Sequence, residues 1–227
     1  MKRAPWYKMA LSYLRDVHIE SCSSEYNPDM QVLLSRGRYQ LVTAKAIYSH
    51  EDLYNNFSEI LWQTCDLSQT DVRKVLVLGL GLGSIPIILD KINPGRYDIT
   101  AVEIDEVVCE LAAEYAYPMI ESSINTIIGD AYQFVMTSEE EYDLICVDLF
   151  IGDKTPQEFR GKKFLERLSK LTSKSGAILY NTIAYNSRDK KRARGFYLDV
   201  FKTVFPESEM VYAHKNYMLI SHSRWFR

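Results

Sequence analysis

The stretch Lys74–Ser84, with the sequence KVLVLGLGLGS, decides the fold that this chain is expected to adopt. It begins with Val75–Leu78, an unbroken apolar run typical of a strand buried on both faces of a parallel sheet. Glycines then occur at every second position, and the apolar residues after Ser84 recur at helical spacing. Glycines let a ligand approach the backbone closely, and the first turn of a helix offers free N–H groups. The stretch therefore predicts a strand, a glycine turn and a helix, with a ligand at the turn.

The spacing of the glycines does not fit the dinucleotide-binding fingerprint G-x-G-x-x-G/A. Counted from Gly79 the sixth position is Ser84, and counted from Gly81 it is Pro86. The spacing G-x-G-x-G instead resembles motif I of the class I S-adenosylmethionine-dependent transferases. The alternative is a strand–helix turn that binds no ligand, and the surrounding sequence has to decide between the two.

Composition and charge are those of an ordinary globular protein. The 227 residues are 47% hydrophobic and 25% charged, with a net charge of −3 and a pI of about 5.9, so nothing in the charge balance indicates a nucleic-acid partner. The length suffices for one full domain with some residues left over. Two basic runs, Arg160–Lys163 and Arg188–Arg194, lie on predicted helices with acids nearby, which favours solvated helix faces.

The cysteines and the N-terminus favour a cytoplasmic protein. The four cysteines are Cys22, Cys65, Cys109 and Cys146. They match no metal or redox spacing, so we expect no metal, and Cys109 and Cys146 are expected to be buried free thiols. Lys8 and Arg15 interrupt any apolar core near the N-terminus, which argues against a signal peptide. No apolar run approaches the length needed to span a membrane, and no membrane contact is expected.

Residues 1–48 are predicted to form a small antiparallel β domain, ahead of a larger domain over residues 49–227. Its strands are expected at Val17–Cys22, Gln31–Leu34, Tyr39–Thr43 and Ala46–Tyr48. From His50 the apolar residues recur at helical spacing, which predicts a helix that ends near Asp66, with Ser49 as its cap.

Strands and helices then alternate to the end of the chain. Further strands are expected at Tyr97–Ile104, Asn125–Ile128, Tyr142–Asp148 and Ala177–Asn181, the last after a turn at Ser175–Gly176. Helices are expected from Asp105 to about Tyr115, from Ala131 through Phe134, over Gln157–Leu171 and over Arg188–Val204. Met210–Ala213 and Tyr217–Ser221 form a closing antiparallel pair. The sequence therefore predicts an α/β, doubly wound, Rossmann-like sheet that is mostly parallel and ends with an antiparallel strand.

Carboxylates stand where three predicted strands end, on the side where such a sheet binds its ligand. Glu103 can accept hydrogen bonds from both hydroxyls of a ribose, and Asp105 behind it is expected to cap a helix. Asp130 can accept from an exocyclic adenine amine while the Ala131 N–H meets a ring nitrogen. Asp148 is the best candidate for a catalytic group. The alternatives are an exposed acid for Glu103, a helix cap for Asp130 and a polar strand terminus for Asp148.

Taken in order, these features resemble the class I S-adenosylmethionine-dependent fold, and within it the spermidine synthase-like group. The segments that carry the resemblance are VLVLGLGLGS at 75–84, AVEIDEVV at 101–108, IIGDAYQFV at 127–135 and YDLICVDLF at 142–150. The residues that the resemblance implies for the cosubstrate are Gly79, Leu80, Gly81, Gly83, Glu103, Ile104, Asp130 and Ala131. It implies Asp148 as the catalytic residue, Tyr54 and Asp148 as contacts of the acceptor, and a homodimer.

The departures from this group bear on the reaction. Spermidine synthases carry an aspartate in the glycine loop at the position of Leu82, and an acid at the position of Asn56. Methyltransferases often place an acid where Val77 stands. We therefore expect S-adenosylmethionine, or its decarboxylated form, as cosubstrate, and a small acceptor that can be an amine. Methyl transfer is favoured. The alternatives are aminopropyl transfer to a polyamine, and a protein that binds a nucleoside thioether without catalysis.

Overall fold

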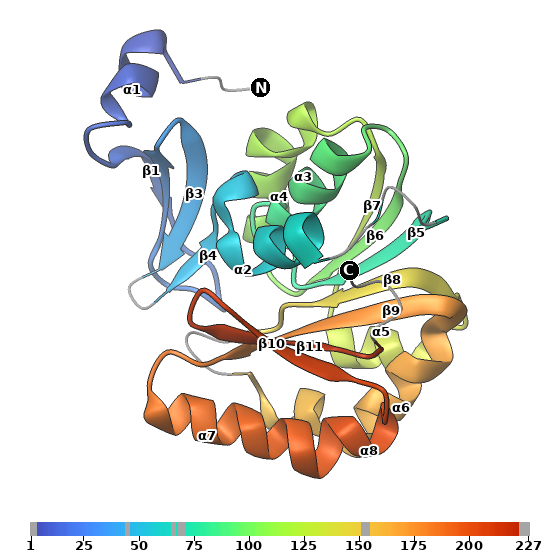
Figure 1. The fold of residues 1–227 in the computed structure, drawn as a ribbon. Coiled ribbons are helices and arrows are strands. Elements are labelled where there is room, and N and C mark those ends of the chain that lie inside the picture. The colour runs from blue at the N-terminus through green and yellow to red at the C-terminus, as the bar shows by residue number, and fades with distance from the viewer. Residues whose placement is uncertain (1–3, 44–45, 65–66, 68–70, 151–154, 223–227) are drawn as a thin grey trace.

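The computed structural model describes residues 4–43, 46–64, 67, 71–150 and 155–222, and it contains two β-sheets (Figure 1). The smaller sheet is antiparallel and has the order β1-β2-β3-β4. Its strands are β1 (Val17–Cys22), β2 (Met30–Ser35), β3 (Arg38–Thr43) and β4 (Ile47–Ser49). A small antiparallel β unit at the start of the chain is therefore confirmed.

The larger sheet has seven strands in the order β10-β11-β9-β8-β5-β6-β7. Its strands are β5 (Lys74–Leu78), β6 (Asp98–Glu103), β7 (Ser123–Ile128), β8 (Tyr142–Val147), β9 (Thr172–Ile183), β10 (Glu209–Ala213) and β11 (Asn216–Ile220). Neighbouring strands from β7 to β9 are parallel, whereas β11 is antiparallel to both β9 and β10. The predicted mostly parallel sheet with an antiparallel strand near its end is confirmed.

Helices cover both faces of the larger sheet, as a doubly wound fold requires (Figure 1). On one face lie α2 (Asn55–Glu59), α3 (Ser84–Ile92) and α4 (Glu106–Tyr115). On the other lie α5 (Ala131–Thr137), α6 (Lys162–Leu171), α7 (Ser187–Phe196) and α8 (Lys202–Val204). Short 3₁₀ helices occur at Glu51–Leu53, Tyr117–Met119 and Gln157–Arg160, and π-helical turns at Ile60–Thr64 and Tyr197–Phe201. The apolar strand residues divide between two buried clusters, one under each helical layer.

The order of the strands fixes where a ligand can bind. The chain proceeds outward from β5 to β6 and β7 on one side, then returns to β8 on the other side of β5. Such a switch point opens a crevice beyond the carboxyl ends of the two central strands. Gly79 follows β5 and Asp148 follows β8, and the Asp148 N–H donates to the Leu78 carbonyl over 2.8 Å. The two residues are therefore held at the crevice by the sheet itself.

Several predicted elements differ in detail. Ser49 does not cap a helix, because its hydroxyl lies 2.6 Å from that of Ser84 and it belongs to β4. The helix predicted from His50 is divided into a 3₁₀ turn, α2 and a π-helical turn, while its predicted end at Asp66, like Cys65, lies outside the described residues. The N-terminal helix α1 (Trp6–Leu11) was not predicted, and it buries none of its residues.

The predicted turn at Ser175–Gly176 is wrong, because β9 runs through it without a break. The pairing of β9 with β8 explains why Ser175–Gly176 has the sequence pattern of a turn. Tyr142 pairs with Thr172 but Leu144 pairs with Ala177, so β9 carries extra residues in a bulge. Gly176 lies in this bulge, where a Cβ atom would come within 2.9 Å of the Asp143 carbonyl oxygen. A residue without a side chain is needed there for close packing rather than for a turn.

Cys109 and Cys146 are buried and neither forms a disulfide, as predicted. In the part of the chain that the structure describes, no helix combines the length and the apolar character that crossing a membrane would need.

Candidate active site

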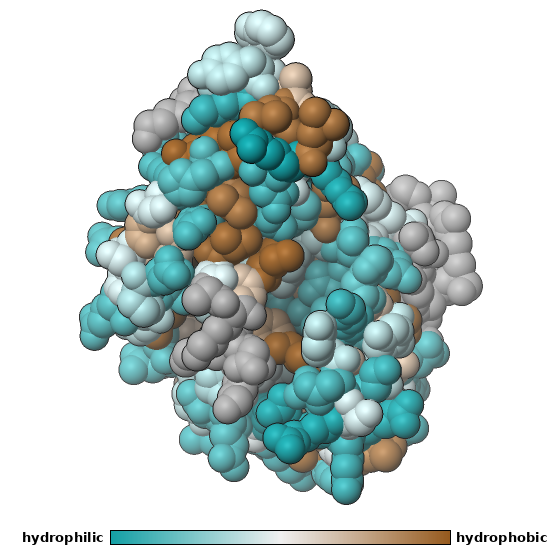
Figure 2. Space-filling view, turned by 90° about the vertical axis from the view of Figure 1, so that its left-hand side faces the viewer, coloured by the Kyte–Doolittle hydropathy of each residue, from teal (hydrophilic) through white to brown (hydrophobic). Residues whose placement is uncertain are grey.

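A cavity of about 710 Å³ opens at the switch point, between the small sheet and the carboxyl ends of the larger one. Gly79, Gly81, Glu103, Asp130 and Asp148 all line it, although they come from four separate strand ends. The size falls in the range of sites for small molecules and cofactors. Figure 2 shows the face that lies on the left of Figure 1, where apolar side chains gather over the small sheet and hydrophilic ones cover the lower half. The structure thus brings together the main residues that the sequence singled out.

The glycine loop adopts a conformation that favours glycine at each of its three glycine positions. Gly79, Gly81 and Gly83 have φ angles of +89°, +53° and +79°. A Cβ atom at Gly79 would overlap the Asp148 carbonyl oxygen, and one at Gly81 would lie 3.1 Å from the Tyr48 carbonyl oxygen. The loop therefore packs against the end of β8 and against the small sheet, so its glycines serve the fold as well as any ligand.

We expect Gly79→Ala to lower the free energy of unfolding by about 2–4 kcal/mol, from left-handed backbone strain together with overpacking. Gly129→Ala is the matched control, since Gly129 lines the same cavity and a Cβ atom there would meet nothing within 4 Å. Urea unfolding of both variants measures the difference. Equal stability of the two variants would show that the contact with Asp148 is unimportant.

The residues between the glycines point away from the cavity. Leu80 is 3% exposed and packs in the cluster under α2 and α3, so only its backbone is placed to serve a ligand. Leu82 is 2% exposed and packs with β2, β3 and α4. Gly83 directly precedes α3, where a Cβ atom would lie 3.1 Å from Ala116. The side chain of Leu82 therefore points away from the cavity.

Glu103 is not an exposed acid, because its carboxylate accepts four backbone N–H groups. Oε2 accepts from Leu80 over 3.0 Å and from Gly81 over 3.4 Å, while Oε1 accepts from Ile104 over 2.9 Å and from Asp105 over 3.1 Å. Burial raises the pKa of Glu103, and the backbone donors act in the opposite direction. The carboxylate thus holds the glycine loop in place, and the bond from Gly81 is the longest and weakest of the four.

Asp105 and Asp130 both cap helices. Asp105 accepts from the Val107 N–H at the start of α4, as predicted, and is almost fully buried. Oδ1 of Asp130 accepts from the Gln133 N–H over 2.8 Å at the start of α5, which is the alternative left open by the sequence. Asp130 also lines the cavity together with Ile104 and Ala131, so capping leaves it placed to meet a ligand.

Asp148 lies at the centre of a small polar cluster. Tyr54 donates its hydroxyl to Oδ2 over 2.9 Å, and the Asn181 amide donates to Oδ1 over 2.8 Å. Asn56 is buried nearby, and its side chain acts to lower the pKa of Tyr54. Tyr54 and Asp148 are 94 positions apart in sequence, and the fold brings these two candidate residues into direct contact.

The surroundings of Asp148 bring its pKa closer to neutral pH. Burial raises the pKa of Asp148 to about 6, while the hydrogen bonds from Asn181 and Tyr54 act to lower it. Burial also raises the pKa of Tyr54 well above its usual value, and the nearby Asp148 carboxylate adds to this. At neutral pH Asp148 is thus an ionised base and Tyr54 a neutral donor.

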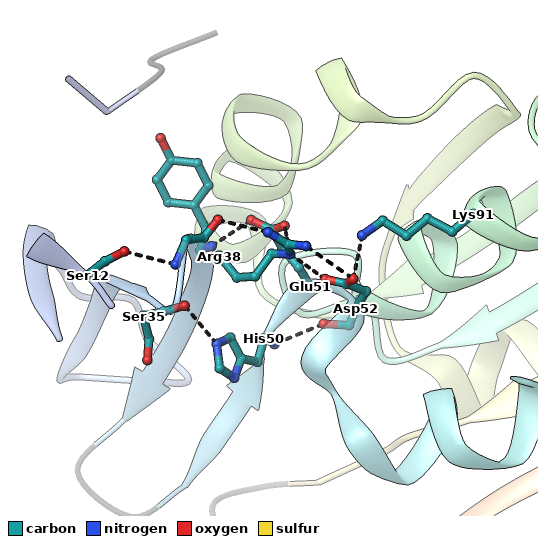
Figure 3. Close-up of polar contacts among 10 residues, drawn as sticks. Ser12, Ser35, Arg38, His50, Glu51, Asp52 and Lys91 are labelled. Carbon is teal, nitrogen blue, oxygen red and sulfur yellow. Dashed lines mark hydrogen bonds and ion pairs between the residues drawn. The ribbon is translucent and has the colours of Figure 1, made fainter. Parts of the chain in front are cut away.

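Ion pairs and a hydrogen bond hold in place the segment that leads into Tyr54 (Figure 3). Asp52 lies between Arg38 of β3 and Lys91 of α3, with nitrogen–oxygen distances of 2.6 and 2.5 Å. Glu51 accepts from the Tyr39 N–H over 2.6 Å and holds a φ of +40°, which is uncommon for a residue other than glycine. These contacts join the small sheet to the larger unit two and three residues before Tyr54.

Burial raises the pKa of Glu51 to about 6. The folded state therefore binds this proton more tightly than the unfolded state, so stability falls as the pH rises from about 4.5 to about 6. Glutamine keeps the acceptor for the Tyr39 N–H but does not ionise. We therefore expect Glu51→Gln to reduce the pH-dependent loss of unfolding free energy by about 2 kcal/mol. Thermal unfolding between pH 4 and pH 7 measures it, with the exposed Glu110→Gln as control. Identical pH profiles for wild type and Glu51→Gln would contradict the assignment.

Sequence reasoning missed Asn181, which completes the polar cluster. Asn181 lies at the end of the predicted strand Ala177–Asn181, the same kind of position that singled out Asp148. A polar residue after an apolar strand was therefore an available signal. His50, Tyr48 and Lys215 also line the cavity from outside the glycine loop and the strand-end acids, and their sequence neighbourhood carried no such signal.

Comparisons with known proteins point to one family. The model of the spermine/spermidine synthase domain matches residues 55–220. A polyamine aminopropyltransferase of Vibrio vulnificus is 32% identical over 115 residues, covering 49% of this chain and 38% of the relative. An eEF1A lysine and N-terminal methyltransferase homolog of Drosophila melanogaster is 29% identical over 164 residues, covering 68% of this chain and 24% of the relative. The chain thus spans less than half of the length of either relative.

Solved structures show the same fold. Spermidine synthase from Thermotoga maritima aligns with a TM-score of 0.68 at 13% identity, covering 90% of this chain and 72% of that one. Human methyltransferase-like protein 13, in complex with SAH, aligns with a TM-score of 0.53 at 23% identity, covering 66% of this chain and 72% of that one. At such identities the likeness establishes the class I fold and not the reaction.

Proposed function

Because the chain belongs to the spermine/spermidine synthase domain family, we propose that it is a transferase with an S-adenosyl sulfonium cosubstrate, and that it transfers the methyl group of S-adenosylmethionine. Glu103, Ile104, Asp130, Ala131 and the backbone of the glycine loop are proposed to hold the adenosyl part. Tyr54 and Asp148 are proposed to receive the acceptor. The names of the relatives support a transferase and include both methyl and aminopropyl transfer.

One observation carries the preference for methyl transfer. No side chain of the glycine loop offers a carboxylate to the cavity, because the loop GLGLGS at 79–84 contains no acid and Leu82 packs against the small sheet. A loop acid would attract the free amine of a decarboxylated donor and repel the carboxylate of S-adenosylmethionine. Specificity is a difference between two affinities, and without that repulsion the intact donor is not disfavoured.

The proposed chemistry needs in-line attack on a carbon next to a positive sulfur. The lone pair of the acceptor forms the new bond to carbon, and the carbon–sulfur bond breaks with its electron pair going to sulfur. The sulfonium becomes a neutral thioether, and the proton that the nucleophile loses passes to Asp148. Rate enhancement then comes from placement of the two substrates and from removal of the proton.

Aminopropyl transfer is the second candidate, favoured by the Tyr54–Asp148 pair itself. A buried carboxylate next to a phenol is a suitable place to bind and deprotonate an ammonium group, which a polyamine supplies. Both candidates use the same adenosyl site, and they differ in the group transferred.

Product analysis tests the proposal. The protein is incubated with S-adenosylmethionine, or with its decarboxylated form, together with 1,4-diaminobutane, spermidine or a lysine-containing peptide, and adenosyl products are identified by mass spectrometry. S-adenosylhomocysteine from the intact donor, formed far more slowly with Asp148→Asn, supports methyl transfer. Methylthioadenosine from the decarboxylated donor would establish aminopropyl transfer instead, and tight binding of both donors with neither product would favour a binding protein.

A further inference from the structure

Helix α7 concentrates positive charge in a chain whose net charge is −3. It has five basic side chains and one acid, and the acid, Asp189, is already paired with Arg192 over 2.9 Å. The basic residues are Arg188, Lys190, Lys191, Arg192 and Arg194. The helix begins beside the cavity, on the side of the molecule that Figure 2 faces, and Asn186 and Asp189 both line the cavity.

This arrangement costs the helix stability. Residues three or four positions apart lie on the same side of a helix, so Arg188 repels both Lys191 and Arg192, and Arg194 repels both Lys190 and Lys191. Positive charges near the first turn also oppose the helix dipole. A helix face that only meets solvent mixes charges of both signs. The stability of the fold therefore does not explain these cations, which indicates a role in binding.

Three cations of this region lie over tyrosine rings. The distances from the charged group to the ring centroid are 4.7 Å for Lys215 and Tyr185, 5.1 Å for Lys190 and Tyr212, and 5.7 Å for Arg194 and Tyr217. Each ring attracts its cation electrostatically and so holds it in place. The first pair lines the cavity, and the other two lie between α7 and the β10–β11 hairpin. With Arg188 and Lys191, these three cations form a basic surface that extends from the cavity.

The turn between β10 and β11 brings Lys215 to the cavity at a cost in backbone strain. His214 and Lys215 have φ angles of +41° and +65°, a conformation that tight hairpins usually give to asparagine and glycine. His214 Nε2 lies 3.3 Å from Glu59 Oε2 on α2, while Lys215 reaches Tyr185. Glycine would form this turn with less strain, so the side chains that stand here serve more than the turn.

Acids limit the extent of the basic surface. Asp199, Glu207 and Glu209 are exposed, and they lie beyond the end of α7 and at the start of β10. From Arg188 to Arg194 the helix rises about 9 Å, the length of about three extended residues. A short segment with several carboxylates fits this length, whereas a longer nucleic-acid strand would bring phosphates against the acids. The pI of about 5.9 also differs from that of basic nucleic-acid-binding domains.

We infer that the basic surface is a docking site for an acidic polypeptide segment, which presents the acceptor to the cavity. The inference rests on the proposed function for the existence of an acceptor, and it adds the class of molecule that carries it. Carboxylates of the segment pair with the cations of α7, while the side chain to be modified enters the cavity past Tyr185 and Lys215. A free polyamine is itself a cation and is repelled by this surface.

Two labelled peptides of equal length test the docking site. One carries four glutamates between glycines, and the other carries four glutamines at the same positions. Their affinities for the full chain, saturated with S-adenosylhomocysteine, are measured by fluorescence anisotropy at low and at high salt. Wild type is expected to bind the glutamate peptide about tenfold or more tightly at low salt. The preference is expected to shrink as salt is raised, because salt screens exposed charges.

Two double variants separate binding from a structural role. Arg188→Gln with Lys191→Gln removes two cations that lie over no tyrosine among the contacts above, and it is expected to weaken binding of the glutamate peptide about fivefold or more. Because it relieves repulsion, it is expected not to lower the thermal stability. Lys163→Gln with Lys170→Gln is the matched control, since both lysines are exposed on α6 and the net charge changes equally. The control is expected to bind as wild type does.

NMR of the amide groups locates the bound peptide. The signals of Tyr185 and Lys215 are expected to shift with the glutamate peptide, and those of α6 are not. The inference is overturned if wild type binds the two peptides equally or binds neither, if the two double variants bind alike, or if the α7 variant alone loses thermal stability. Tighter binding of a ten-residue oligothymidylate would overturn it in favour of a nucleic acid. Failure of wild type to bind S-adenosylhomocysteine would instead refute the proposed function, since peptide binding is measurable without it.

Discussion

Asp148→Asn is expected to lower turnover by about 100-fold or more while changing the affinity for the donor little. Asparagine keeps the size of the side chain and can keep both contacts, because its oxygen accepts from Asn181 and its amide donates to the Tyr54 hydroxyl. It cannot accept the proton that the nucleophile loses. Steady-state rates and calorimetric titration of the donor, on the same protein, measure the two effects. A variant that stays active would reassign Asp148 to positioning and favour a nucleophile that needs no deprotonation.

The same substitution is expected to stabilise the protein at neutral pH. The pKa of Asp148 rises on folding from 3.8 to about 6, so ionised Asp148 costs stability above about pH 6 and nothing below about pH 4. Asparagine removes this cost, which predicts a gain of about 2–3 kcal/mol at pH 7 that vanishes toward pH 4. Denaturant unfolding at both values of pH measures the gain. A gain of equal size at pH 4 and pH 7 would contradict the proposed ionisation.

Glu103→Ala is expected to weaken binding of S-adenosylhomocysteine by about 100-fold, through loss of charged hydrogen bonds worth about 2–3 kcal/mol. The structure adds a second reason, since Glu103 holds the N–H groups of Leu80 and Gly81 and so shapes the loop that faces the ligand. Calorimetry measures the affinity, and circular dichroism verifies that the variant is folded.

Glu103→Gln is the matched comparison for this effect. Glutamine fills the same space but has one acceptor oxygen, so it supports either the loop or the ribose in full, and an intermediate affinity is expected. An affinity equal to that of wild type in folded Glu103→Ala would exclude Glu103 as the ribose contact.

The sequence predicts the architecture because its strands carry strong local signals. Val75–Leu78 is apolar throughout, as burial on both faces requires, and the turn after it has glycine where φ is positive. The acids at the strand ends are also predictable, since parallel strands finish at one edge of the sheet. The sequence therefore predicts that Glu103, Asp130 and Asp148 meet at one site, and all three line the cavity.

The features that escaped prediction depend on contacts between distant segments. Gly176 has the signature of a turn, but it lies in a bulge whose partner, Asp143, is on another strand. Leu82 matches a ligand-binding position in the motif, yet its side chain packs against the small sheet. The contact between Asn181 and Asp148 depends on how β8 and β9 pair. Single-sequence patterns carry no information on such pairings.

The most direct test of the donor assignment is a paired calorimetric titration of the wild-type protein with S-adenosylmethionine and with its decarboxylated form. We predict that the intact donor binds at least as tightly as the decarboxylated one, because no acid of the glycine loop faces the cavity. A preference of about tenfold or more for the decarboxylated donor, about 1.4 kcal/mol, would contradict methyl transfer and restore aminopropyl transfer.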